Sequence, residues 1–192
     1  MVLPIRVFDD PVLRAVTHRV PGPSEELDRL IADMTETVRH AGGIGLAAPQ
    51  VGRSERLFLV DLTFMMEELD EEAQAGFPLQ PMVFINPMIL WEGPEELDFE
   101  EGCLSIPGVR ENVIRPERIR ISYHDQAFTK HTIEAGDMLA RVIQHEYDHV
   151  EGILFIDRIS PLRRTMLRRR LREIARGVVE TDYLIAAHQR AA

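Results

Sequence analysis

The sequence has little of what secreted and membrane proteins require. Its 192 residues include a single cysteine, Cys103, which excludes an intramolecular disulfide and fits a reducing compartment. No apolar run is long enough to span a bilayer. The start of the chain lacks the charged and apolar regions of a signal peptide and the Arg/Ser bias of a transit peptide. We therefore expect a cytoplasmic protein without membrane attachment.

Internal repeats and low-complexity linkers are also absent from the sequence. A chain of this length with 45% hydrophobic and 28% charged residues is typical of one soluble globular domain. We therefore expect residues 1–192 to form a single domain. The order of the tail, residues 181–192, is not determined by the sequence, because chain ends of this kind often fray.

Positive charge is scarce overall but concentrated near the end of the chain. The formal net charge of −10 argues against general nucleic-acid binding, DNA included. Residues 62–80 are rich in Asp and Glu and are expected to be a solvated surface insertion. Charge alone favours a solvated last helix whose arginines pair with the acidic body of the protein. These arginines are Arg163, Arg164, Arg168, Arg169, Arg170 and Arg172.

Hydrophobic periodicity predicts three helices. The first covers residues 24–41, where Ser24 is a candidate N-cap. The second is expected to have Asp137 as its N-cap and to stop at Gly152. The third begins at Pro161 and is expected to reach about residue 178.

Strands are predicted between these helices from alternating or β-branched runs. The segments are Arg56–Leu62, Met82–Ile85 and Arg118–Tyr123. The order helix, strands, helix, helix indicates an α+β fold.

The segment His145-Glu146-Tyr147-Asp148-His149 carries the clearest chemical signal. Two histidines four residues apart lie on one helical face and can present two metal ligands, with Glu146 beside them as a base. Neutral imidazole suits zinc or ferrous iron. The alternative is an ordinary amphipathic helix with exposed histidines, which the motif alone does not exclude.

A hydrolytic metal site usually needs a third protein ligand. Cys103, within Glu-Gly-Cys-Leu-Ser, is a candidate, although most free cysteines are small buried hydrophobic residues, and spacing does not choose between the two. The segment Gly43–Gln50, Gly-Ile-Gly-Leu-Ala-Ala-Pro-Gln, predicts a loop whose backbone can lie against a ligand. Its Gln50 offers an amide N–H₂ that could stabilise an oxyanion.

The three motifs G-I-G-L-A-A-P-Q, E-G-C-L-S and Q-H-E-Y-D-H, in this order and spacing, resemble those of bacterial peptide deformylases. The resemblance covers roughly residues 3–160 and implies antiparallel sheets around a central metal-bearing helix. It implies that the chain removes the N-formyl group from the initiator methionine of nascent polypeptides and releases formate.

Carried over residue by residue, the resemblance assigns the metal ligands to Cys103, His145 and His149. Glu146 matches the general acid/base, and Gln50 and the backbone N–H of Leu104 match the oxyanion stabilisers. Residues that match the substrate-binding positions are Ile44, Gly45, Arg110, Met138 and Val142. Arg115 matches a structural arginine that is expected to pair with Glu101 and Asp148.

The resemblance also implies a mechanism, a metal and partners. A metal-bound water would attack the formyl carbon while Glu146 handles the proton. One ferrous ion per chain is implied as the native metal, with zinc, nickel or cobalt able to substitute, and the donor types alone do not choose among them. The partners implied are N-formylmethionyl nascent peptides, and the ribosome through the basic helix that begins at Pro161.

Two other functions remain compatible with parts of the sequence. A zinc endopeptidase would use the His-Glu-x-x-His motif but would normally recruit a His or Glu as its third ligand. A non-catalytic metal-binding or ribosome-associated module would not need Glu146, because a purely structural site needs no base.

Overall fold

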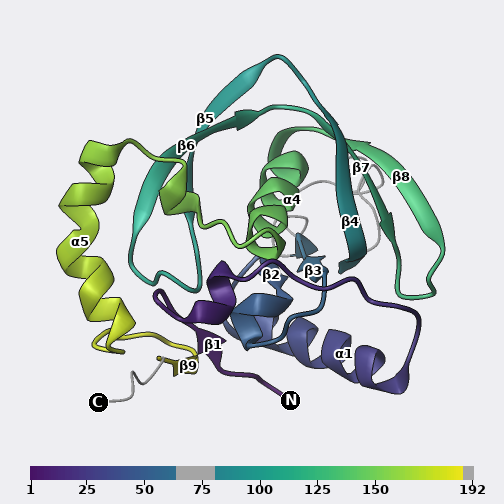
Figure 1. Ribbon diagram of the computed structural model, residues 1–192, viewed down its shortest axis with the longest axis horizontal. Coiled ribbons are helices and arrows are strands. Elements are labelled where there is room, and N and C mark those ends of the chain that lie inside the picture. Colours follow the sequence, from purple (N-terminus) through teal and green to yellow (C-terminus); the bar gives the residue numbers. More distant parts are fainter. Residues whose placement is uncertain (64–80, 188–192) are drawn as a thin grey trace.

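The computed structural model describes residues 1–63 and 81–187 (Figure 1). Most of the predicted acidic insertion, residues 64–80, and the last five residues of the chain lie outside this part. The described part combines helices with three β-sheets, as the α+β prediction requires. Within it, no helix combines the length and the apolarity that crossing a bilayer requires.

The largest sheet is antiparallel, and its strands follow the order β2-β3-β4-β7-β8. The predicted strand at residues 82–85 is longer in the structure, because β4 continues past Pro87 through two register irregularities. Ile119 and Ile121 of β7 lie in the core, as the sequence pattern predicts, although Ser122 between Ile121 and Tyr123 is buried as well. The strands are β2 (Gly45–Ala47), β3 (Leu57–Val60), β4 (Met82–Glu92), β7 (Ile119–His124) and β8 (Lys130–Ala135).

A long antiparallel hairpin forms the second sheet. It consists of β5 (Glu96–Gly102) and β6 (Arg110–Pro116), with Gly102 opposite Arg110 at its end. Nearly all side chains of β5 are exposed, so the sequence lacks the apolar alternation that would have predicted this strand. The hairpin arches over the central helix in Figure 1.

The three predicted helices are present as α1 (Glu25–His40), α4 (Asp137–Val150) and α5 (Pro161–Ala175). Ser24 caps α1, its side chain accepting the N–H of Leu27 at 3.1 Å. The predicted N-cap of α4 was wrong by one residue: Gly136 occupies that position, and Asp137 begins the helix with a φ of 50°. The helix α5 ends earlier than expected, at Ala175.

The central helix α4 is buried, and the sheets surround it (Figure 1). Its apolar side chains Val142 and Ile143 pack with Phe58 and Phe84 of the large sheet. Behind it, α5 contributes Leu171 and Ile174 to a cluster with Phe155 of the short helix η3 (Phe155–Asp157). Burying each large apolar side chain stabilises the folded state by about 1.5–3 kcal/mol. This stabilisation holds α4 against the large sheet.

The two ends of the described chain meet in the third sheet. The strand β1 (Ile5–Arg6) pairs in parallel with β9 (Ile185–Ala186). The chain therefore returns after α5 to the region where it began, and the two strands lie together in Figure 1. Between β1 and α1 lies the short helix η1 (Pro11–Arg14), and after β2 lies η2 (Ala48–Val51).

Candidate metal centre

The helix α4 presents both predicted histidines to the same side. His145 and His149 are 9% and 1% exposed, so they are not the solvated histidines of an ordinary surface helix. Their rings lie edge to face with centroids 5.2 Å apart. Because one helical turn separates them, their positions are fixed by the backbone of a buried helix.

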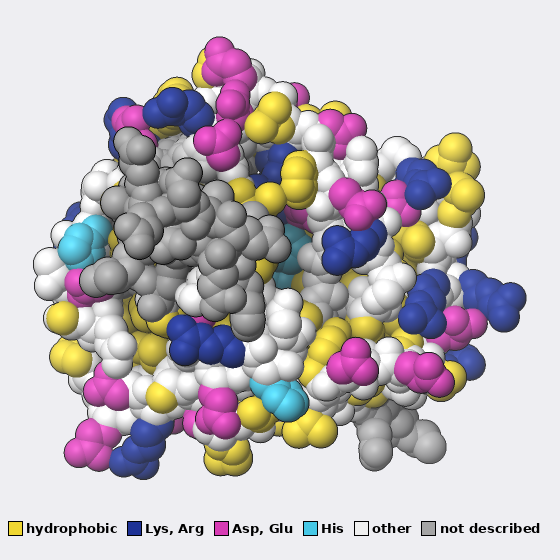
Figure 2. All heavy atoms as spheres, turned by 180° about the vertical axis from the view of Figure 1, so that it is seen from behind, with side chains coloured by type: hydrophobic (Ala, Val, Ile, Leu, Met, Phe, Trp, Pro, Cys, Tyr) yellow, Lys and Arg dark blue, Asp and Glu magenta, His cyan; other side chains and the backbone are white. Residues whose placement is uncertain are grey.

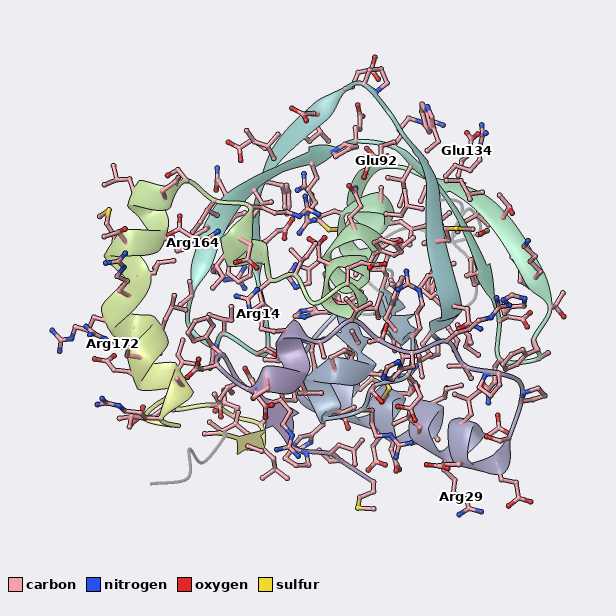
Figure 3. The ribbon with its side chains drawn as sticks, in the orientation of Figure 1. Arg14, Arg29, Glu92, Glu134, Arg164 and Arg172 are labelled. Atoms are coloured by element: carbon pink, nitrogen blue, oxygen red, sulfur yellow. The ribbon has the colours of Figure 1, made fainter. Side chains whose placement is uncertain are left out.

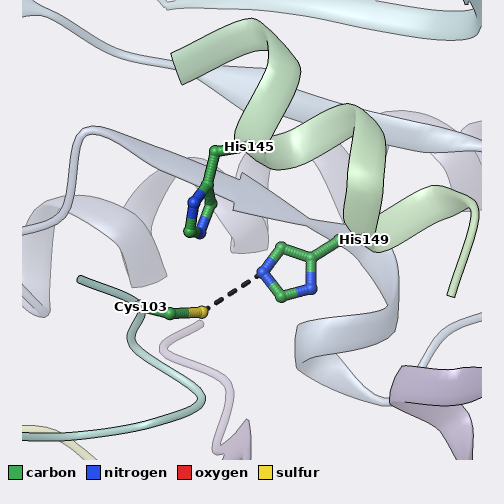
Figure 4. Close-up of side chains that lie close together, drawn as sticks. All are labelled: Cys103, His145 and His149. Atoms are coloured by element: carbon green, nitrogen blue, oxygen red, sulfur yellow. Dashed lines mark hydrogen bonds between the residues drawn. The ribbon is translucent and has the colours of Figure 1, made fainter. Parts of the chain in front are cut away.

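Cys103 reaches the same point from a different element. It follows the last residue of β5, and its Sγ lies 3.2 Å from Nε2 of His149 (Figure 4). One ligand atom from each of Cys103, His145 and His149 lies within 4.8 Å of the others. Three soft or borderline donors converging in this way fit a first-row divalent metal such as zinc or ferrous iron.

The surroundings of the histidines also fit a metal ion. Nδ1 of His145 lies 2.9 Å from a carboxylate oxygen of Glu101, which leaves Nε2 for a ligand. Burial lowers the pKa of His149 well below its usual value, so this ring is neutral, the form that binds metals. Burial alone would lower the pKa of His145, but hydrogen bonds with Cys103 and Glu101 outweigh burial and raise this pKa well above its usual value.

A buried network of charged side chains holds Glu101 in place. Arg115 donates to Glu101 at 2.6 and 2.9 Å and to Asp148 at 2.7 Å, which confirms the pairing predicted for this arginine. Arg141 of α4 donates to Oε1 of Glu101 at 3.0 Å, the oxygen that Arg115 also contacts at 2.6 Å. Burial opposes ionisation of Glu101, but hydrogen bonds from Arg115 and His145 hold its pKa well below the usual range.

Glu146 differs from Glu101 in having no such partners. It is 3% exposed, and its Oε2 is buried without a hydrogen-bond partner among the described residues. Burial raises its pKa to about 7, so it can take up and release a proton near neutral pH. Gly45 of β2 lies directly against it, because a Cβ at Gly45 would be 2.5 Å from Oε1 of Glu146.

Gln50 is oriented by the backbone at the end of β2. Its Oε1 accepts the N–H of Ala47 at 2.7 Å, which turns its Nε2 toward Cys103 and Ser105. The distances from Nε2 are 3.5 Å to Sγ of Cys103 and 3.4 Å to Oγ of Ser105. The amide N–H₂ therefore faces the centre as a donor, as the sequence predicted.

These groups open onto a cavity of about 680 Å³. His149 is not among the described residues that line it. The predicted residues that do line it are Ile44, Gly45, Gln50, Cys103, Leu104, Arg110, Met138, Val142, His145 and Glu146. The structure thus brings together residues that are about a hundred positions apart in the sequence.

The cavity also has walls that the sequence did not predict. The guanidinium of Arg141 lies over the ring of Phe99 of β5, with Cζ of Arg141 5.9 Å from the ring centroid. Tyr183 and its neighbours in residues 180–182, which follow α5, form another part of the lining. No local motif marks Arg141 or Tyr183, because each reaches the cavity only through the tertiary fold.

A divalent metal beside a carboxylate that can exchange a proton, in a cavity open to substrate, is the arrangement of metal-dependent hydrolases. The described fold and centre place the chain in that class. A model of the polypeptide deformylase family matches residues 2–165, and the chain belongs to this family.

Individual relatives agree over nearly the whole length. The chain is 56% identical to the peptide deformylase of Salinibacter ruber over 185 residues, 95% of this chain and 93% of the relative. The crystal structure of a peptide deformylase from Legionella pneumophila superposes with a TM-score of 0.79 at 36% identity, covering 93% of this chain and 98% of that one. The structure from Thermotoga maritima gives 0.74 at 41% identity, covering 84% and 99%.

Membership in this family establishes the reaction. The chain is a metal-dependent hydrolase that removes the N-formyl group from nascent polypeptides. The alternatives of an endopeptidase and of a non-catalytic module are therefore set aside.

Proposed function

We propose that the chain carries out this hydrolysis with Cys103, His145 and His149 as the ligands of one divalent metal ion. The observation that carries the proposal is the convergence of the three ligand atoms, within 4.8 Å, beside the buried carboxylate of Glu146, whose Oε2 has no hydrogen-bond partner among the described residues. When bound, such an ion acts as a Lewis acid and makes a water nucleophilic near neutral pH.

Ferrous iron is the native metal in this proposal, and zinc, nickel or cobalt could occupy the same ligands. The family resemblance supports iron, and a thiolate with two imidazoles suits each of these metals. Iron with a thiolate ligand is easily oxidised, so the iron form is expected to lose formate-releasing activity in air. Metal analysis of protein purified without oxygen tests the assignment, and undiminished activity of the iron form after prolonged exposure to air would contradict it.

Glu146 moves the proton. Its carboxylate accepts a proton from the attacking water and returns it to the leaving amine as formate departs. A pKa of about 7 supports both steps, because the group can change its protonation state near neutral pH at little cost in free energy. Its position against Gly45 keeps the carboxylate over the cavity.

Two donors stabilise the negative charge that develops on the formyl oxygen. They are the amide N–H₂ of Gln50 and the backbone N–H of Leu104, both at the cavity. The bond from Ala47 to Gln50 fixes the amide before substrate binds, and donors that need no reorganisation stabilise a transition state best.

The substrate peptide lies in the cavity beside α4. Met138 and Val142 of α4, with Ile44, supply apolar surface for the methionine side chain. The strand β2, which contains Gly45, is the edge of the large sheet and can pair with an extended peptide through its backbone. Arg110, 70% exposed at the side chain, flanks the groove where the peptide leaves.

The substitution Glu146→Gln tests these roles. The variant should retain its metal but release formate from formyl-Met-Ala-Ser about a hundred to ten thousand times more slowly, the typical contribution of a general base. Glu134→Gln, on exposed β8, is the matched control and should behave as wild type. Normal formate release by Glu146→Gln, or internal cleavage of an unformylated peptide by wild type, would contradict the proposal.

We further propose that α5 contacts the ribosome. Most of its arginines have partners: Arg163 binds Glu111, and Arg164 donates to the carbonyl of Ile156. Arg168 and Arg172 are exposed and make no ion pair among the described residues. Figure 2 shows basic side chains gathered at the edge that carries α5, and Figure 3 shows Arg172 pointing away from the body. Such arginines are free to meet phosphates.

Charge reversal at Arg168 and Arg172 tests this contact better than removing α5, which would also remove the buried Leu171 and Ile174. The double variant should co-sediment less with ribosomes at low salt while keeping its activity on a short formyl peptide. Reversal of Arg29, exposed on α1, is the control. Equal binding by the double variant and wild type would exclude α5 as the contact.

We also propose that residues 1–192 form one domain that acts in the cytoplasm. The single cysteine, the absence of a bilayer-crossing helix among the described residues and the role in protein synthesis support this location. One core cluster joins α4 to the large sheet, and another joins α5 to β6 and to the segment after β1, which supports a single cooperative unit.

A further inference from the structure

The segment that carries Cys103 and Leu104 has each of its carbonyl groups fixed by a hydrogen bond. The carbonyl of Cys103 accepts the N–H of Ile106 at 2.9 Å. The carbonyl of Leu104 accepts the hydroxyl of Tyr183 at 2.8 Å, and that of Ser105 accepts the N–H of Phe8 at 2.9 Å. Three consecutive peptide groups at the metal centre are therefore held in one orientation.

Two of these three donors come from opposite ends of the described chain. Phe8 follows β1, and Tyr183 precedes β9. The two strands pair in parallel, with Ile5 opposite Ile185, and the N–H of Ile5 also donates to Leu184 at 2.8 Å. The two ends thus form one unit, with β1 and β9 together in Figure 1, and the hydrogen bonds from Phe8 and Tyr183 attach this unit to the segment 103–105.

We propose that Tyr183 is a positioning residue for the reaction, acting through Leu104. The peptide group between Cys103 and Leu104 carries the N–H that faces the formyl oxygen, and the group between Leu104 and Ser105 carries the carbonyl that Tyr183 holds. Fixing both groups fixes the backbone dihedral angles of Leu104 between them. The hydroxyl of Tyr183 therefore keeps the Leu104 N–H aimed into the cavity before substrate arrives.

This inference rests on the proposed role of the Leu104 N–H, and it goes beyond the family match. The family model ends at residue 165, so Tyr183 lies outside the part of the chain that defines the family. Yet Tyr183 lines the same cavity as Gln50 and Glu146. A purely structural tyrosine at this place would satisfy the Leu104 carbonyl without affecting the rate.

The substitution Tyr183→Phe separates these two roles, because it removes the hydroxyl and keeps the ring. In metal-loaded protein assayed with formyl-Met-Ala-Ser, we expect kcat to fall about three- to tenfold, the effect of one neutral hydrogen bond, with KM unchanged. Metal content and Tm should stay close to wild type. Tyr123→Phe is the matched control, because Tyr123 is a buried tyrosine of β7 that does not line the cavity.

Hydrogen–deuterium exchange provides a readout that does not depend on turnover. In Tyr183→Phe, the peptide that contains residues 103–106 should exchange faster than in wild type, and in Tyr123→Phe it should not. Faster exchange together with a lower kcat supports positioning through Leu104.

Two results would overturn the inference. One is a kcat and an exchange rate in Tyr183→Phe equal to those of wild type, which would leave the ring with a packing role only. The other is a loss of activity that parallels a loss of bound metal, which would assign the effect to Cys103 instead. A wild-type protein that released no formate in the same assay would refute the proposed function, so the two failures are distinguishable.

Discussion

Gly45 and Glu146 lie in contact in a way that leaves no room for a larger residue at position 45. A Cβ there would lie 2.5 Å from Oε1 and 2.8 Å from Cδ of Glu146, closer than such atoms approach. Glu146 is buried, so its carboxylate must move away from its present position. For Gly45→Ala we expect kcat for formate release to fall by about tenfold to a hundredfold, as displacement of a catalytic group by about 1 Å does.

The control for this prediction is Gly22→Ala, because nothing lies within 4 Å of a Cβ at Gly22. It should leave kcat unchanged. Metal content should be the same in both variants, since Gly45 contacts the carboxylate of Glu146 rather than a ligand. A Gly45→Ala variant with full activity would mean that Glu146 works from a different position.

At the same scale, the sequence predicted the centre well because its motifs are local. Each motif is a short run of consecutive residues, and the histidine motif lies within α4, so spacing alone brings His145 next to His149. The resemblance then supplied Cys103, which spacing had left open. Arg141 and Tyr183 were missed because an arginine in a helix and a tyrosine in a tail carry no local sign of the residues they contact.

The end of α4 depends on one glycine. Gly152 has a φ of 74°, and a Cβ there would lie 2.6 Å from the carbonyl oxygen of Arg14. Any side chain at this position would destabilise the folded state, because it would strain the left-handed backbone and clash with the Arg14 carbonyl. For Gly152→Ala we expect a loss of about 1–3 kcal/mol in the free energy of unfolding, measured by urea denaturation. Gly136→Ala, at the other end of α4, meets nothing closer than 3.8 Å and should lose far less.

An ion pair between a half-exposed arginine and a buried aspartate links α1 to the loop after β3. Nε of Arg39 donates to Asp61 at 2.7 Å, and Asp61 is 2% exposed. Burial raises the pKa of Asp61, but hydrogen bonds from Thr63 and Arg39 outweigh it and lower the pKa below its usual value. A carboxyl whose pKa is lower in the folded state stabilises that state fully at pH values above its unfolded-state pKa, which is about 3.9 for Asp. This stabilisation is lost as the pH falls through the folded-state pKa.

The free energy of unfolding should therefore decrease as pH is lowered from about 5 to about 3, and Asp61→Asn should weaken this dependence. Asp98→Asn, an exposed carboxylate of β5, is the control and should leave the dependence as in wild type. Identical pH profiles for Asp61→Asn and wild type would show that the pair with Arg39 does not contribute.

Element by element, prediction succeeded where one face is buried and failed where none is. The helix α1 buries a regular stripe, α4 is buried over most of its surface, and Ile119, Ile121 and Tyr123 of β7 enter the core at every second position, so these sequences carry the period of the structure. The hairpin strand β5 exposes even Leu97 and Phe99, and β1 and β9 are only two residues long. The strand predicted at Met82–Ile85 was too short, because bulges let β4 continue past Pro87.

For the whole molecule, the metal should contribute to stability, because its proposed ligands join α4 to the end of β5. A ligand that binds only the folded state stabilises it by about 2.7 kcal/mol at a free concentration of a hundred times Kd. Chelation should therefore lower Tm by roughly 5–10 °C. Cys103→Ala should show no such difference between metal-loaded and chelated protein, whereas His131→Ala, outside the centre, should keep it.

The pairing of β1 with β9 sets a condition on the synthesis of this protein. Of the described elements, β9 is the last to be made, and Tyr183 comes just before it. A growing chain has Cys103, His145 and His149 well before it has the donor that holds Leu104. Hence an enzyme that acts on other proteins as they emerge from the ribosome acquires its own fully ordered active site only after residue 186 has been added and has folded back onto residues 5–6.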